Sequence, residues 1–372
     1  MMETTKARIP AIEYIRGVSM LGVVGIHVGS QYLANPSPNL ALVALFEIAT
    51  RFSVPIFFFV SAFGLFYHLD MGKPFDYASF LRRRAKTVLV PYIVWSLFYI
   101  FHYTVLYRDT MLLHLNVLAR YLFYGFGCYQ LYFMVILLWF YLLMPLWIWM
   151  VRRMTLGRLA VLLAAQIAFD YWSSYLLSPG SIGTPLLREM VENRLNYWVM
   201  HYVFIFVLGG WLAVHYEEFL TFIGRRRGAI AAFFCCSLAS MLGYYYYLIL
   251  ARGYDAIGAI NTAHQLCPSG VIYTAAASLF LFAVFTPDAS PAAIRPVLSF
   301  LGRHSYFVYL AHPLAITYLG LALERTGRVM TAPMAIAFYF AVVLLTLAAA
   351  VIVRRIGQSF PLVNSLTIGI WK

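Results

Sequence analysis

Two residues of the first apolar stretch, Arg16 and His27, have types and spacing that suit a shared reaction path. Eleven residues of α-helix make three turns plus about 20°, so both side chains share one face, about 16 Å apart along the axis. A neutral imidazole is the natural general base near neutral pH, and a guanidinium binds anions. This spacing predicts one polar path with His27 as the base. The simpler alternative is a histidine that only hydrogen-bonds a neighbouring helix.

A basic cluster is the second candidate for chemistry, and it consists of Arg82, Arg83, Arg84 and Lys86. So dense a group of cations suits the binding of a polyphosphate. The alternative is a positively charged loop that only fixes the orientation of the chain in a membrane. We favour that alternative for the other basic cluster, Arg225–Arg227.

Further polar side chains stand in otherwise apolar stretches. Glu47 and Arg51 are four residues apart with the acid first, so a regular helix would pair them. His312 precedes Pro313 at a predicted depth similar to that of His27, and the sequence leaves open whether it is a partner of His27 or a packing residue. Three more fall in the outer halves of predicted spans and are expected either to line an acceptor pocket or to lie at the membrane interface: His102, Asp170 and His201.

The composition predicts which elements position these residues. The chain has 372 residues, of which 63% are hydrophobic and 11% charged, and its mean hydropathy is +0.78. A soluble domain is about 25% charged, so the composition excludes a cytosolic enzyme, a disordered scaffold and a secreted disulfide module. What it predicts is an all-α, polytopic helical bundle in a membrane. The net charge of +13 fits cytoplasmic loops rather than nucleic acid, since no basic stripe lies outside those loops.

The apolar runs predict about ten spans in a single domain, 1–372, with both termini cytoplasmic because Lys and Arg concentrate in alternate loops. The segment 110–126 is apolar but carries polar residues, which favours an interfacial helix. The second span is expected to kink at Pro55 and to begin as early as Leu40. The predicted spans are 11–33, 45–67, 88–106, 129–150, 157–177, 197–215, 229–250, 268–286, 298–320 and 331–353.

The four cysteines lack the spacing of metal ligands, so no metal site is expected. Cys235 and Cys236 stand in an apolar run. Cys128 and Cys267 fall near the predicted outer side, and the sequence leaves open whether they form a disulfide.

Five motifs, in order along the chain, resemble those of the acyltransferase-3 family, whose members are integral membrane O-acyltransferases of sugars and polysaccharides. Each motif alone is weakly specific, but together they cover most of the spans. The resemblance marks four supporting residues: Ser61, Tyr132, Tyr309 and His312. The motifs are Glu13–Gly17 with His27, Arg51–Ser61, Phe80–Arg84 with Pro91–Trp95, Tyr129–Phe133 with Tyr141–Pro145, and Ser305–Pro313.

The resemblance implies a stand-alone acyltransferase of the bacterial cytoplasmic membrane. It would move an acetyl or succinyl group from acyl-CoA, a co-substrate rather than a bound cofactor, to a hydroxyl of a cell-surface glycan or glycolipid precursor. His27 would be the catalytic base. Arg16 and the basic cluster would bind the donor, and Glu47, Arg51, His102, Asp170 and His201 the acceptor. Proteins of envelope-polysaccharide biosynthesis are the expected partners.

The chain departs from the family pattern at two places. The family's Arg-x-x-Arg reads Arg84-Ala85-Lys86-Thr87, so Lys86 or the preceding arginines would supply the second charge, and Ala62 replaces the glycine after Ser61. Several alternatives stay open: an acyl-His27 intermediate, an exporter that uses the same polar path, and a degenerate sensor.

Overall fold

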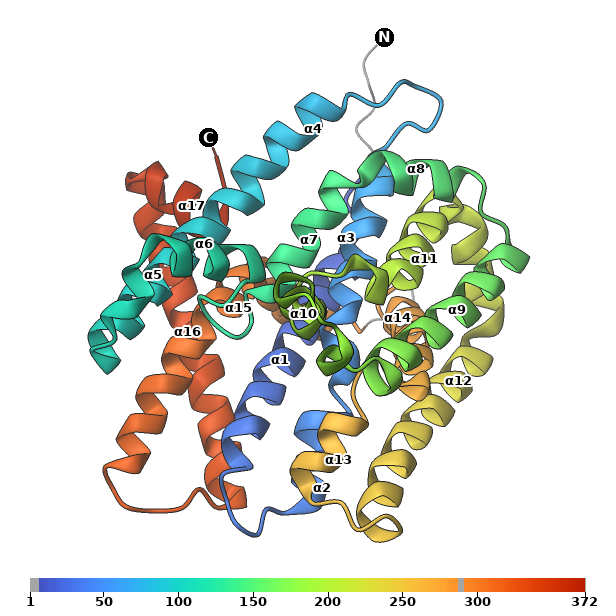
Figure 1. Cartoon of the computed structure of the whole chain (residues 1–372). Helices are drawn as coiled ribbons and strands as arrows, with labels where there is room; N and C mark the ends of the chain where they lie inside the picture. The colour runs from blue at the N-terminus through green and yellow to red at the C-terminus, as the bar shows by residue number, and fades with distance from the viewer. Residues whose placement is uncertain (1–6, 287–290, 372) are drawn as a thin grey trace. The chain divides into compact units, whose positions relative to one another are not determined.

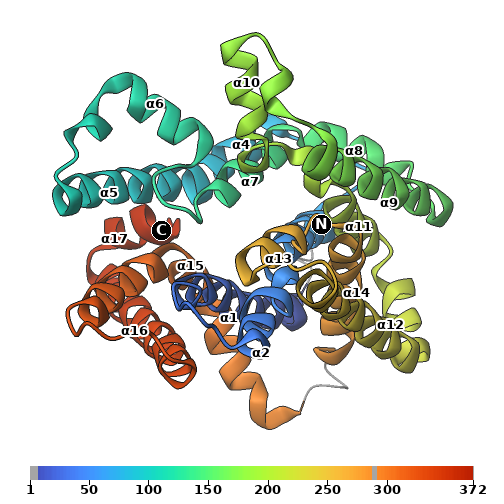
Figure 2. The same ribbon diagram turned by 60° about the horizontal axis from the view of Figure 1, so that its bottom comes forward.

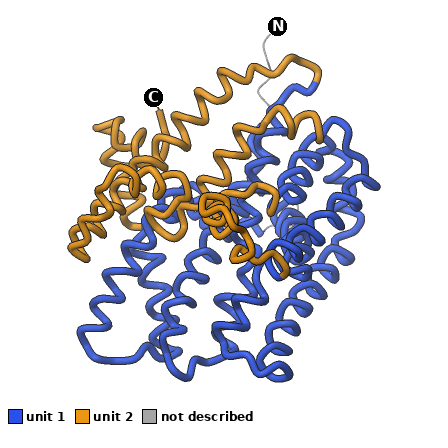
Figure 3. Tube along the Cα trace, viewed as in Figure 1, with its two compact units in different colours: residues 1–71, 151–175, 202–347 blue, residues 72–150, 176–201, 348–372 orange. Residues whose placement is uncertain are grey.

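The computed structural model describes residues 7–286 and 291–371, and these form helices and loops with no β-strand among them (Figure 1). The predicted all-α class is therefore confirmed. The chain makes two compact units, each assembled from three separate stretches of sequence (Figure 3). Unit 1 comprises residues 1–71, 151–175 and 202–347, and unit 2 comprises residues 72–150, 176–201 and 348–372.

Unit 1 is built from paired long helices. Within it α1 packs against α15 and α12 against α14 (Figure 2), and α3 packs against α11. Its elements are α1 (Pro10–Tyr32), α2 (Leu40–Val43), a π-helix (Ala44–Ile48), a 3₁₀ turn (Arg51–Ser53), α3 (Pro55–His68), α9 (Leu156–Tyr171), a π-helix (Trp172–Leu176), α11 (Val203–Val214), α12 (Tyr216–Leu250), α13 (Ala256–Thr262), α14 (Pro268–Val284), a 3₁₀ turn (Ala292–Ile294), α15 (Arg295–Glu324) and most of α16 (Ala332–Ser359).

Unit 2 is built around α5 and α7, and within it α17 packs on α5 and α4 packs on α7. Its elements are α4 (Tyr77–Arg84), a π-helix (Ala85–Leu89), α5 (Val90–Tyr107), a 3₁₀ turn (Thr110–Leu113), α6 (Leu115–Tyr124), α7 (Tyr132–Leu142), most of α8 (Met144–Arg152), a 3₁₀ turn (Pro179–Ser181), α10 (Pro185–Glu192), two further 3₁₀ turns (Arg194–Asn196 and Val199–Tyr202) and α17 (Pro361–Ile368).

The described residues contain 7 helices, or series of helices, long and apolar enough to cross a membrane, and 8 if α7 and α8, bent by 65°, count as one span. The two other predicted spans, 197–215 and 268–286, correspond to shorter apolar helices, Val199–Val214 and Pro268–Val284. Apolar residues continue past the helix ends there. The Cys267 thiol caps the start of α14 by accepting from the Gly270 amide. Ten apolar runs are therefore present, but two of them form helices shorter than a full membrane span.

The second predicted span is broken rather than merely kinked. Its helical path runs from Leu40 to His68, but it passes through the π-helix Ala44–Ile48 and the 3₁₀ turn Arg51–Ser53 before α3 begins at Pro55. Proline has no amide hydrogen and a fixed φ, so it suits the first turn of a helix. The break thus lies just before Pro55, and the predicted early start at Leu40 is observed.

The four cysteines are free, so Cys128 and Cys267 do not form a disulfide. Both are buried, and they belong to different units. The Cys128 sulfur lies 3.3 Å from the Tyr103 hydroxyl, and Cys267 acts as the helix cap described above. Each thiol therefore has a local packing role.

Two glycines bring α1 and α15 into close contact. A Cβ at Gly17 would lie 2.8 Å from the Gly302 amide nitrogen, and a Cβ at Gly302 would overlap the Glu13 carbonyl oxygen. Small residues at such crossings let helix backbones approach closely in membranes. This contact holds α1 and α15 against each other over the segments that carry His27 and His312.

The substitution Gly302→Ala is expected to lower the free energy of unfolding by about 1–3 kcal/mol, because the added methyl must push two backbones apart. Thermal unfolding of the purified protein in detergent measures this. Gly320→Ala on the same helix is the matched control, since a Cβ there meets only the Gln31 side chain at 4.0 Å. Equal unfolding temperatures for the two variants would contradict the close approach.

Candidate active site

Helix α1 carries Arg16 and His27 on one uninterrupted run. The helix begins with Pro10 in its first turn and has Glu13 nearby, both of which favour a helix N-terminus. Arg16 is exposed, and His27 keeps part of its surface exposed between the buried residues Ile26 and Val28. Because the helix is regular between them, Arg16 and His27 share one face of α1, as the spacing predicts.

The rings of His27 and His312 stack on each other. Their centroids lie 5.2 Å apart and the planes are inclined by 21°. His312 is fully buried, whereas His27 is only partly so. The sequence left the relation of the two residues open, and the structure places their rings in direct contact.

The protonation of His312 is set by its own helix. Its Nδ1 lies 3.1 Å from the Val308 carbonyl oxygen, which can only accept a hydrogen bond. Nδ1 therefore carries the proton and donates, and Nε2 of the neutral ring carries the lone pair. Pro313 lies within α15 and has no amide hydrogen, which disturbs the backbone hydrogen bonding of this same turn.

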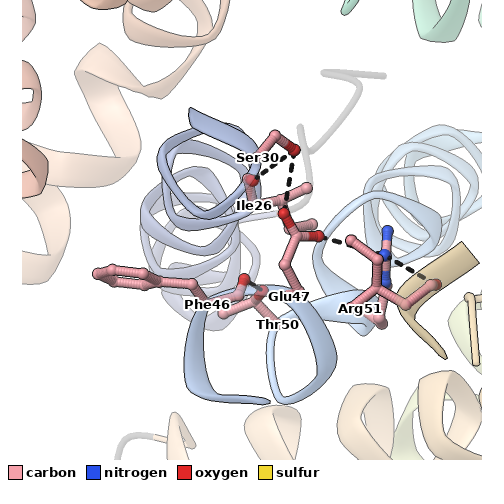
Figure 4. Close-up of polar contacts among 7 residues, drawn as sticks. Ile26, Ser30, Phe46, Glu47, Thr50 and Arg51 are labelled. Atoms are coloured by element: carbon pink, nitrogen blue, oxygen red, sulfur yellow. Dashed lines mark hydrogen bonds and ion pairs between the residues drawn. The ribbon is translucent and has the colours of Figure 1, made fainter. Parts of the chain in front are cut away.

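A buried ion pair between Glu47 and Arg51 lies against the next turn of α1, where it contacts Ser30 (Figure 4). Glu47 Oε2 lies 3.2 Å from Arg51 Nη2, and the Ser30 hydroxyl donates to Glu47 Oε1 at 3.0 Å. Arg51 Nη2 also donates to the Ile260 carbonyl of α13 at 3.2 Å. Glu47 is only 1% exposed and Arg51 13%. The carboxylate is thus held from both sides by donors.

The irregular second span places Glu47 against α1. Glu47 belongs to the π-helix Ala44–Ile48, and Arg51 opens the 3₁₀ turn, so the pair forms across a break rather than on the regular helix that we expected. A Cβ at Gly29 would lie 2.9 Å from Glu47 Oε1. The glycine therefore leaves room for the carboxylate on the surface of α1.

These elements bring four predicted residues of unit 1 into one cluster: His27, His312, Glu47 and Arg51. The charge of Arg51 lies within electrostatic range of His27. An imidazole beside a buried, fixed ion pair suits a general base, since the ion pair orients polar groups in a region with little water. Among the described residues, no group of three or more His, Cys, Asp or Glu side chains is arranged to hold a metal ion.

A family model described as an acyltransferase domain, that of acyltransferase-3, matches residues 9–355. The chain belongs to the acyltransferase-3 family. It is a membrane acyltransferase, since the match covers nearly the whole chain and its apolar helices are long enough to span a bilayer. No curated protein and no solved structure matches the chain.

The acyltransferase-3 match contains the whole histidine and ion-pair cluster. Tyr309 belongs to the same turn of α15 as His312, and their rings lie 6.4 Å apart. Ser61 lies in α3, on the same broken span as Glu47. Tyr132 begins α7 of unit 2.

The basic cluster belongs to unit 2, where α4 gives way to the π-helix Ala85–Leu89. Arg84 lies over two rings, with its guanidinium carbon 5.3 Å from the Phe80 centroid and 5.4 Å from that of Tyr141. Arg82, Arg83 and Lys86 are exposed. Three cations of this membrane acyltransferase are therefore exposed to a ligand, while Arg84 is held over two rings.

Asp76 caps the basic helix α4. Its carboxylate accepts from the Ser79 amide at 3.0 Å, and these hydrogen bonds hold the pKa of Asp76 below its usual value. An acid at this end also suits the helix dipole. The cap thus fixes where the helix that carries the three arginines begins.

The other predicted acceptor residues belong to α9 and to unit 2. Asp170 is fully buried in α9 and accepts from Gln166 Nε2 at 2.9 Å, while Gln166 Oε1 accepts from the Phe204 amide. This arrangement ties α9 to the start of α11. His102 and His201 belong to unit 2, where their rings stack on Phe98 and Trp198.

Sequence reasoning missed Ser30 and Gly29. Gly22, Gly25 and Gly29 recur at helical spacing on α1 and face the broken second span, as their nearest neighbours Ser53, Phe46 and Glu47 show. That spacing is the signal for a close helix contact. Ser30 gives no signal of its own, since a serine in a span often bonds its own backbone, as this one also does with Ile26.

Proposed function

We propose that this membrane acyltransferase moves an acetyl or succinyl group from cytoplasmic acyl-CoA to a hydroxyl of a cell-surface glycan or glycolipid precursor, with His27 as the general base. One observation carries the proposal: in an acyltransferase-3 chain, a partly exposed His27 stacks on His312 beside a buried Glu47–Arg51 pair. The setting is a bacterial cytoplasmic membrane, and proteins of envelope-polysaccharide biosynthesis are the expected partners.

The reaction balances with the groups of this chain. The acceptor oxygen attacks the thioester carbonyl carbon while its proton passes to an imidazole nitrogen of His27. A C–O bond forms and the C–S bond breaks, so the sulfur of CoA leaves as a thiolate. The proton then passes from His27 to that thiolate, which gives one ester and one CoA thiol.

His312 supports His27 as a positioning residue. Its Nδ1–H is committed to the Val308 carbonyl, which fixes the ring on which His27 rests. Two imidazolium rings stacked at this distance would repel each other, so the pair accepts one proton far more readily than two. The transfer step requires one proton, which His27 takes from the acceptor hydroxyl and then gives to the CoA thiolate.

We assign different residues to the binding of the donor and of the acceptor. The phosphates of CoA are assigned to Arg82, Arg83, Arg84 and Lys86, with Arg16 at the start of the path along α1. The acceptor is assigned to Glu47 and Arg51, with Asp170, His102 and His201 as further contacts. These assignments rest on charge and on family resemblance.

The experiment that tests the proposed function is release of CoA thiol by the purified protein in detergent, with acetyl-CoA or succinyl-CoA and a crude membrane glycan as the acceptor. His27-dependent release is the expected result. Folded protein that consumes neither donor would overturn the proposal and favour an exporter with the same polar path.

The double variant Arg84→Ala/Lys86→Ala is expected to raise the KM for acyl-CoA by about 10-fold or more, because each charge-assisted hydrogen bond to a phosphate contributes roughly 1.5–3 kcal/mol. The kcat is expected to change little. Arg225→Ala/Arg227→Ala, in the other basic cluster, is the matched control. An unchanged KM in the first variant would show that its charges only orient the chain.

A further inference from the structure

The segment after α17 is fastened to the basic cluster within unit 2. Trp371 Nε1 donates to the Lys86 carbonyl at 2.7 Å, and Trp95 Nε1 donates to the Thr367 carbonyl at 2.9 Å. Gly369 adopts φ +67, and a Cβ there would overlap the Thr87 carbonyl. These contacts place an indole ring at the π-helix that carries Lys86.

The Trp371 ring lies beside the cations and is open to a ligand. The Lys86 ammonium lies 5.8 Å from the ring centroid, and Arg82 and Arg83 are exposed one turn earlier. The Trp371 side chain is 42% exposed. Among the residues that the structure describes, no aromatic ring stacks on it. A flat aromatic surface next to several cations is the combination that binds a nucleotide, since the base stacks and the phosphates pair.

We propose that Trp371 is a stacking platform for the adenine base of the donor, with the neighbouring cations on its phosphates. This inference rests on the proposed function, because it takes acyl-CoA as the donor. It assigns a role to a residue that lies beyond the matched region 9–355. The indole hydrogen bond to the Lys86 carbonyl fixes the ring plane, so the base meets a surface already in place.

Two other roles predict different behaviour. A tryptophan at the membrane interface would anchor the chain, and its loss would affect stability without regard to the donor. A purely structural Trp371 would hold Lys86 in place, and its loss would weaken every ligand that carries a phosphate. If Trp371 is a stacking platform, its loss weakens the binding of a ligand with adenine and not the binding of a ligand without adenine.

The test compares binding of CoA with binding of 4′-phosphopantetheine by calorimetry on the full-length protein in detergent. 4′-Phosphopantetheine keeps one phosphate and lacks adenine, the ribose with its 3′-phosphate and the second phosphate of the diphosphate. Trp371→Ala is expected to weaken CoA binding about 5- to 100-fold and to leave 4′-phosphopantetheine binding unchanged. Trp371→Phe is expected to restore most of the CoA affinity. Trp149→Ala, another exposed tryptophan of unit 2, is the matched control.

Equal losses for both ligands, or no loss for either, would overturn the stacking role. Failure of the proposed function has a different signature. A wild-type protein that binds CoA with the expected dependence on Trp371, but releases no thiol from acyl-CoA, would support the platform and contradict the transfer reaction. A wild-type protein that binds no CoA would overturn both.

Discussion

Replacement of His27 with alanine is expected to lower the rate of acyl transfer by about 10²–10⁴-fold, the usual contribution of a general base. The imidazole is the group that takes the proton of the acceptor hydroxyl in the proposed reaction. Alanine also suits a helix interior, so α1 should keep its structure. The kcat for CoA release is the quantity to measure, with succinyl-CoA and acetyl-CoA in parallel.

His68→Ala is the matched control, because His68 is an exposed histidine at the end of α3 that lies opposite the break with the ion pair. Its kcat should equal that of the wild type. If both variants unfold at the wild-type temperature, a loss of rate in His27→Ala comes from the missing imidazole and not from misfolding. A His27→Ala protein that is folded and retains wild-type turnover would exclude His27 as the base.

Replacement of Glu47 with alanine is expected to lower the free energy of unfolding by about 3–5 kcal/mol, because it leaves the Arg51 guanidinium buried without its carboxylate. Glu47 is 1% exposed, so water does not take the place of the lost oxygen atoms. The Ser30 hydroxyl loses its acceptor in the same change. Thermal unfolding in detergent measures the loss.

Two further variants separate charge from hydrogen bonding. Glu47→Gln keeps an acceptor for Ser30 but removes the negative charge, so its stability should fall between those of the wild type and Glu47→Ala. The double variant Glu47→Ala/Arg51→Ala removes the uncompensated charge and should regain part of the loss. If the double variant is as unstable as the sum of both single variants, the pair is not coupled.

Much of the architecture could be predicted from local features of the sequence. Apolar runs locate nearly all the long helices because each must bury or expose a continuous apolar surface in lipid. The phase of Arg16 and His27 follows from helix geometry alone, and α1 is regular enough for it to apply. Breaks within a span were harder to predict, as the second span shows, since a π-helix and a 3₁₀ turn interrupt it before α3 begins at Pro55.

The site could be predicted only in part because its decisive contacts join distant segments. The stacking of His27 on His312 depends on how α1 and α15 pack, and these helices also approach closely at Gly17 and Gly302. The Glu47–Arg51 pair was expected on a regular helix and forms instead across a π-helix and a 3₁₀ turn. The tie of Asp170 in α9 to the start of α11, which runs through Gln166, likewise depends on tertiary packing.

The π-helix at Ala44–Ile48 makes the ion pair depend on the length of the chain as well as on its residues. A π-turn holds one more residue than the α-turn it replaces. Removal of one residue there would return this turn to regular α-helical geometry and would shift the residues within the turn relative to α1. A single-residue deletion in this turn is therefore expected to disturb the buried ion pair without any substitution at Glu47 or Arg51.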